Sequence, residues 1–115
     1  MTSEPGAAVE EVLGALADPT RRLLLDRLSS HGEATATVLA AELPVTRQAI
    51  VQHLSVLTRA GLVTGHRDGR ERWYAVCPGK LTETARWMDQ TAAQWDLRLA
   101  AIKRIAETGT EDAAG

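Results

Sequence analysis

The sequence predicts a mainly α-helical domain with one small β-hairpin. Alanine and leucine are abundant and aromatic residues make up only 3% of the chain, a composition that favours helices over a β-sandwich or barrel. Apolar residues recur at helical spacing over most of the chain, and the period changes to that of strands only around an Asp68-Gly69 pair. The 115 residues suffice for a modest core, so we expect residues 1–115 to form a single domain that is ordered over about 7–106.

Two helices are expected at the N-terminal end. Valines and leucines recur every three or four residues between residues 7 and 17, which predicts the first helix. Asp18 and Pro19 then begin a second, because Asp18 can cap exposed amides and Pro19 suits the first helical position, where its missing N–H costs nothing. This helix is expected to end near Gly32.

The next pair of helices is joined very tightly. After a stretch at residues 33–36 that can be extended, a third helix is expected to stop at Pro44. Two residues later Thr46 can cap a fourth helix, over about 46–60, which closes at Gly61 in the left-handed conformation. This arrangement is a helix-turn-helix.

A β-hairpin is expected over about 62–76. Residues 62–66 and 72–76 have the pattern of strands, and Asp68-Gly69 between them favours a tight turn. A helix-turn-helix followed by such a hairpin makes a winged helix.

The last predicted helix runs over about 81–106, after Pro78 and Gly79 break the chain. Its apolar residues alternate steps of four and three, which is a seven-residue repeat. A repeat kept this long suits packing against another long helix, and in so small a domain the partner can be a second copy. The residues of the repeat are Leu81, Ala85, Met88, Ala92, Trp95, Leu99, Ile102 and Ala106.

The formal net charge of −2 hides an uneven distribution. Residues 44–76 carry five arginines and two acids, whereas residues 1–43 carry three arginines and seven acids and residues 77–115 carry five bases and six acids. A phosphate backbone responds to local charge across a screening length of about 10 Å, so a net-acidic chain can still bind nucleic acid.

On a helical wheel, the fourth helix presents a continuous arc that contains no glutamate. An ordinary solvated helix would mix Glu and Lys there, whereas Arg, Gln, Ser and Thr can donate to base edges, so we interpret the arc as a DNA-reading face. Arg67, Arg70 and Arg72 surround the hairpin turn, where they can reach phosphates or a minor groove. The alternative is that these arginines only keep an edge strand soluble.

The arc on the fourth helix consists of Arg47, Gln48, Val51, Gln52, Ser55, Thr58 and Arg59.

Three segments resemble, in order and spacing, the ArsR family of bacterial winged-helix transcriptional regulators. They are ALADPTRRLLLDRL, PVTRQAIVQHLSVLTRAGLV and RDGRERWYAV, and the resemblance covers about residues 15–105. It implies a homodimer that binds imperfect inverted repeats in promoters, usually as a repressor, and that pairs through its first and last helices. One position departs from the pattern, because Val51 stands where the family commonly has a serine.

The resemblance and the residue patterns together give two sets of expected site residues. The residues expected to bind double-stranded DNA are Thr46, Arg47, Gln48, Val51, Gln52, Ser55, Arg67, Arg70 and Arg72. The residues expected at the dimer interface are Val9, Val12, Leu16, Leu81, Met88, Trp95, Leu99 and Ile102.

No metal or other cofactor is expected. Many members of the family release DNA when a metal binds, but the helix before the turn has no cysteine pair and the last helix has no histidine. His53 falls on the core side of its helix, and Cys77 is a lone thiol, so we assign both to packing. Trp87 and Trp95 are expected to fill the interface rather than to line a pocket, which leaves any small-molecule effector unknown.

Other functions find little support in the sequence. No catalytic cluster and no phosphate-cradling glycine loop is present, so we do not expect an enzyme. A single cysteine, no export leader and no apolar run of about 18 residues indicate a cytoplasmic protein that does not insert into a membrane. Two alternatives remain open: a winged-helix module that binds protein through its tryptophan-bearing helix, and a metal- or thiol-responsive repressor.

Overall fold

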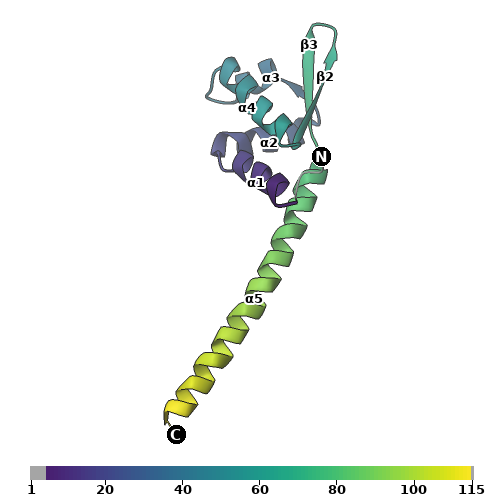
Figure 1. Ribbon diagram of the computed structural model, residues 1–115. Coiled ribbons are helices and arrows are strands. Elements are labelled where there is room, and N and C mark those ends of the chain that lie inside the picture. Colours follow the sequence, from purple (N-terminus) through teal and green to yellow (C-terminus); the bar gives the residue numbers. More distant parts are fainter. Residues whose placement is uncertain (1–4, 115) are drawn as a thin grey trace. The chain divides into compact units, whose positions relative to one another are not determined.

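In the computed structural model, the backbone is described for residues 5–114 and side chains for residues 8–108. The described chain is mainly helical with one small sheet, as predicted (Figure 1). It divides after Thr84 into two compact units. In chain order the elements are α1 (Pro5–Leu16), α2 (Pro19–His31), β1 (Ala34–Thr35), α3 (Ala36–Glu42), α4 (Arg47–Arg59), β2 (Val63–Asp68), β3 (Glu71–Val76) and α5 (Pro78–Ala114).

The core of the first unit is built by leucines and valines from α1 to β2. Val9 and Val12 of α1 lie in it with 7% and 1% of their surface exposed. Both residues were expected at the dimer interface, and their burial leaves little of their side-chain surface to contact a second copy. The large side chains that are fully buried are Leu24, Leu28, Leu39, Ile50, Leu54, Leu57, Leu62 and Val12.

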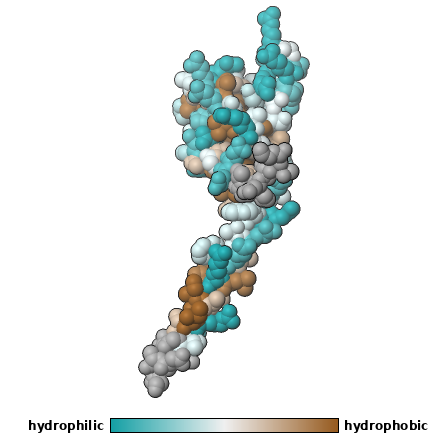
Figure 2. All heavy atoms as spheres, viewed as in Figure 1, coloured by the Kyte–Doolittle hydropathy of each residue, from teal (hydrophilic) through white to brown (hydrophobic). Residues whose placement is uncertain are grey.

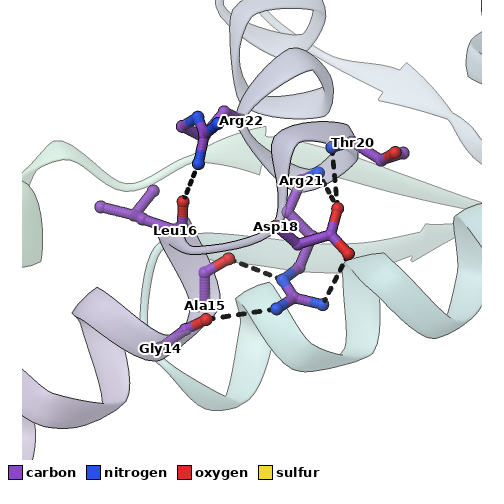
Figure 3. A network of polar contacts seen from close by, with 7 residues as sticks. All are labelled: Gly14, Ala15, Leu16, Asp18, Thr20, Arg21 and Arg22. Carbon is purple, nitrogen blue, oxygen red and sulfur yellow. Dashed lines mark hydrogen bonds and ion pairs between the residues drawn. The ribbon is translucent and has the colours of Figure 1, made fainter.

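The junction of α1 and α2 is held by a polar network around Asp18 (Figure 3). The Asp18 carboxylate accepts hydrogen bonds from the backbone N–H groups of Thr20 (2.7 Å) and Arg21 (3.3 Å), which confirms the predicted cap. Partial burial raises the pKa of this carboxyl, but those hydrogen bonds and the charges of Arg21 and His53 outweigh it. The net pKa lies below the ordinary value of 3.8.

Two arginines of α2 satisfy the last carbonyls of α1. Arg21 donates from Nε to the carbonyl of Ala15 at 2.6 Å and from Nη2 to that of Gly14 at 3.2 Å, and Arg22 donates from Nη1 to that of Leu16 at 2.6 Å (Figure 3). The carbonyls at a helix C-terminus lack intrahelical partners, so these side chains join the two helices at that end.

Both helices of the helix-turn-helix begin at a threonine cap. Thr35 Oγ1 accepts from the backbone N–H of Val38 at 3.2 Å and begins α3, and Thr46 Oγ1 accepts from that of Ala49 at 3.1 Å and begins α4. Gly61 closes α4 with φ of +79°, as predicted.

The sheet has three strands in the order β1-β3-β2, all antiparallel. The hairpin of β2 and β3 was predicted, whereas the pairing of Ala34 and Thr35 with Tyr74 and Trp73 was not. The turn also lies one residue later than expected, because Asp68 pairs with Glu71. Gly69 therefore takes the first of two loop positions, with φ of +67°, which only glycine adopts readily.

The last helix is longer at both ends than the sequence suggested. Pro78 and Gly79 do not break the chain but form the first turn of α5, since proline costs nothing at a first helical position. The helix extends to Ala114. Among the described residues, none of the helices combines the length and apolar character required to cross a membrane.

Candidate nucleic-acid interface

Helix α4 has one buried and one exposed face, as the helical wheel predicted. Ile50, Leu54 and Leu57 are fully buried. The opposite face carries no carboxylate, so the side chains on it are free to approach phosphates and base edges without repulsion. The exposed residues of this face are Arg47, Gln48, Val51, Gln52, Ser55 and Arg59, and Thr46 is exposed at its cap.

One position on α4, Thr58, differs in detail from the predicted arc. The hydroxyl of Thr58 donates to the carbonyl of Leu54 at 2.7 Å, so its proton is used within the helix and Thr58 is not a free donor to DNA. His53 is half-buried, which agrees with the structural role assigned to it.

Arg47 is held at the start of α4 by the preceding helix. Its Nε donates to Thr37 Oγ1 of α3 at 3.2 Å, and both side chains are exposed. The contact restricts the arginine side chain while leaving the terminal nitrogens of its guanidinium available. Thr37 was not predicted as a site residue, because its distance from Arg47 in the chain gave no signal.

The predicted arginines of the hairpin are all exposed. Arg67 on β2 lies directly opposite Arg72 on β3, and Arg70 occupies the second loop position at the tip. Figure 2 shows hydrophilic side chains over this outer end of the hairpin. The guanidinium of Arg72 lies over the ring of Tyr74, 5.7 Å from its centroid, within the range of a cation–π contact.

A groove of about 300 Å3 joins the start of α4 to the hairpin. Four guanidinium groups line it, together with the exposed Val51 and a single carboxylate, Glu71. Of the residues predicted to bind DNA, the groove brings together Arg47 and Val51 of α4 with the three hairpin arginines. Its lining does not include Thr46, Gln48, Gln52 and Ser55. The lining residues are Thr35, Ala36, Thr37, Arg47, Val51, Arg67, Arg70, Glu71, Arg72 and Tyr74.

The second unit, α5 beyond Thr84, presents a row of exposed apolar side chains (Figure 2). Met88, Trp95, Leu99 and Ile102 follow the predicted seven-residue repeat and are 50–59% exposed within the single chain. Leu16 and Leu81, also expected at a dimer interface, are partly buried against the core of the first unit.

No metal site is formed by the described residues. None of their histidine, cysteine, aspartate and glutamate side chains gather in groups of three or more that could hold an ion. Cys77 is a half-buried free thiol whose backbone N–H donates to the carbonyl of Leu62 at 2.8 Å. This hydrogen bond ties the residue after β3 to the start of β2.

Comparisons with known proteins agree with this geometry. A family model for a helix-turn-helix domain matches residues 16–66, which contain all of α4. The HTH-type transcriptional regulator Rv2034 of Mycobacterium tuberculosis is 36% identical over 98 residues, covering 85% of this chain and 88% of that protein. The transcriptional repressor SdpR of Bacillus subtilis is 32% identical over 80 residues, covering 70% of this chain and 88% of the repressor. The solved structure of an ArsR-like transcriptional regulator from Rhodococcus sp. RHA1 is 44% identical with a TM-score of 0.78, covering 87% of this chain and 93% of that one.

Proposed function

The chain belongs to the ArsR family of winged helix-turn-helix transcriptional regulators, and from this membership we propose that it represses transcription by binding an inverted repeat in promoter DNA as a homodimer. It is a DNA-binding transcriptional regulator. The observation that carries the proposal is the arginine-lined groove between α4 and the hairpin. Repression is supported by the similarity to SdpR, which is named a transcriptional repressor.

In this proposal α4 enters the major groove and reads bases. Gln48 and Gln52 are exposed and can pair with adenine, and Arg47 can pair with guanine. Val51, which is 38% exposed, can contact a thymine methyl group but cannot form a hydrogen bond. Ser55 and Thr46, the cap of α4, are also exposed and are the remaining α4 residues proposed to contact DNA.

The hairpin arginines contact the DNA backbone in this proposal. Arg67, Arg70 and Arg72 lie beside α4 in the same groove, so a phosphate that follows the edge of the major groove meets both elements. Contacts of this kind are independent of sequence and weaken as salt rises, because they release condensed counterions.

The homodimer is proposed from the exposed apolar row of α5. An apolar row of this length is unusual on a monomer and is characteristic of an interface. Its seven-residue repeat matches the requirement for packing helix against helix. A two-fold dimer presents two α4 helices to successive major grooves, which requires half-sites about 34 Å apart.

The experiment that tests this function is selection of DNA fragments by the purified protein from a random duplex pool, followed by sequencing. We expect an imperfect palindrome whose half-sites are spaced by one helical turn. Enrichment of a single unrepeated half-site would contradict the homodimer. No enrichment in dilute salt would contradict sequence-specific binding and would favour a winged helix that docks protein through the tryptophan-bearing α5.

Single substitutions then separate base reading from phosphate contact. Arg47→Ala and Gln48→Ala are expected to relax the selected sequence, whereas Arg70→Ala is expected to weaken binding to all sequences alike. An equal loss of specificity in all three variants would show that these roles are wrongly assigned.

A further inference from the structure

Arg72 lies over a position where the neighbouring strand has no side chain. A Cβ atom added to Gly65 of β2 would come within 2.8 Å of Arg72 Nε and 3.1 Å of its Nη2. Real Cβ atoms essentially never approach another atom as closely as 2.8 Å, so an alanine at position 65 would require the guanidinium, the end of a flexible side chain, to shift from its observed place. The glycine has no positive φ, and the backbone therefore does not require it.

Tyr74 is the second residue that contacts the Arg72 guanidinium. It pairs directly with Gly65 in the sheet, and directly paired residues point to the same face. Tyr74 therefore lies on the same face as Gly65 and Arg72, and the Arg72 guanidinium lies over its ring, 5.7 Å from the centroid. Tyr74 itself is only 8% exposed and belongs to the core, so the ring is a fixed support.

Charge repulsion would displace the Arg72 side chain if the support of the Tyr74 ring were lost. Arg67 lies directly opposite Arg72 on the same face of the hairpin, and like charges at such positions repel each other. Without the ring, the Arg72 side chain would sample many rotamers in solvent. It would then lose this conformational freedom on binding DNA. Holding it on the ring reduces that cost in the complex.

We propose that Gly65 and Tyr74 are positioning residues that hold the Arg72 guanidinium in the groove for a DNA phosphate. The inference rests on the proposed phosphate contact of Arg72 and deepens it. Neither residue need touch DNA, and neither was singled out as a site residue by its pattern in the sequence.

The test measures affinity for a random-sequence duplex over a range of salt concentrations, because phosphate contacts do not depend on the operator. Gly65→Ala is expected to weaken binding about three- to tenfold and to leave the slope of log affinity against log salt nearly unchanged, because the released arginine still reaches a phosphate but must be ordered on binding. Its resistance to urea should be unchanged or slightly higher, since alanine suits a strand better than glycine. Gly79→Ala is the matched control, because nothing lies within 4 Å of its added Cβ. It should bind like the wild type.

A double variant tests whether Gly65 affects DNA affinity through Arg72. Gly65→Ala combined with Arg72→Ala should bind no more weakly than Arg72→Ala alone, because the glycine acts only through that arginine. Tyr74→Phe, which keeps the ring face, should retain affinity, whereas Tyr74→Leu should lose it by the same factor as Gly65→Ala.

The outcomes distinguish failure of the proposed phosphate contact from failure of the positioning role. Wild-type affinity in Arg72→Ala would refute the phosphate contact and the inference with it. Reduced affinity in Arg72→Ala together with wild-type binding in Gly65→Ala would refute the positioning role alone. Full additivity in the double variant would also overturn it, because Gly65 would then act on another group.

Discussion

Replacement of Trp95 by alanine should separate the proposed dimer into monomers. Trp95 lies in the centre of the apolar row of α5, and 52% of its surface is exposed in the single chain. A tryptophan has about 250 Å2 of accessible surface, so about 130 Å2 is available for burial against a second copy. At about 25 cal/mol per Å2, burial of this surface stabilises the dimer by about 3 kcal/mol. An alanine at the same position would retain about a third of that stabilisation.

The expected loss is therefore about 2 kcal/mol for each copy, and a symmetric interface buries the residue twice. About 4 kcal/mol corresponds to a rise of about 1000-fold in the dissociation constant of the dimer, since every 1.4 kcal/mol is tenfold. Sedimentation velocity over a dilution series measures this constant directly. DNA affinity should fall in parallel, because a monomer contacts one half-site only.

Leu97→Ala is the matched control. Leu97 is still more exposed, at 72%, but lies about 200° around the helix from Trp95 and outside the repeat. It should leave the dissociation constant almost unchanged. A change of less than about tenfold in Trp95→Ala would refute the assignment of the repeat to the interface, because it falls far short of the area calculation. A wild-type chain that sediments as a monomer at every concentration would refute the dimer itself.

Four further predictions concern the groove and the helix junctions. Gln48→Ala should reduce discrimination at one base pair by about 1–3 kcal/mol in competition binding, whereas Arg70→Ala should keep discrimination and lower the salt slope by about one. Glu71→Gln should tighten binding a few-fold in the same titration, because it removes the one carboxylate of the groove, and weaker binding would show that Glu71 instead orients an arginine. Arg21→Ala should lower the free energy of unfolding in urea by about 2 kcal/mol, because charged hydrogen bonds to helix carbonyls are lost. Asp18 has a lowered pKa, so its charge stabilises the fold fully above pH 3.8 and the stabilisation is lost as pH falls through the folded pKa. Asp18→Asn, which keeps a cap acceptor, should therefore be less stable than the wild type at neutral pH and equally stable in strong acid.

Local chemistry was enough to predict most of the helix boundaries. Asp18, Thr46 and Gly61 stand where the structure places caps and a left-handed turn, since a cap depends only on the residues within one turn of it. The Pro78-Gly79 pair predicts a break, although proline is equally suited to begin a helix, and the sequence offers no local means to choose between these roles.

Interactions between distant segments were not predictable in the same way. The strand Ala34–Thr35 is too short to show a period, and its partner Trp73-Tyr74 lies far along the chain. Arg21 and Arg22 follow a recognisable cap, but their hydrogen bonds to α1 depend on the angle between two helices. The exposed face of α4 was predictable because it follows from periodicity alone.

The groove shows why net charge is a poor guide to this protein. The chain carries more acids than bases, yet four arginines from α4, β2, the hairpin turn and β3 meet around one cavity with a single carboxylate. Phosphates within a screening length of about 10 Å respond to this cluster rather than to the sum over the chain. In the proposed complex, binding depends on a small number of arginines, of which Arg47 donates a hydrogen bond to Thr37 and Arg72 lies over the Tyr74 ring. We therefore expect a modest salt dependence and, in the proposed complex, a larger share of the binding free energy from base reading by α4.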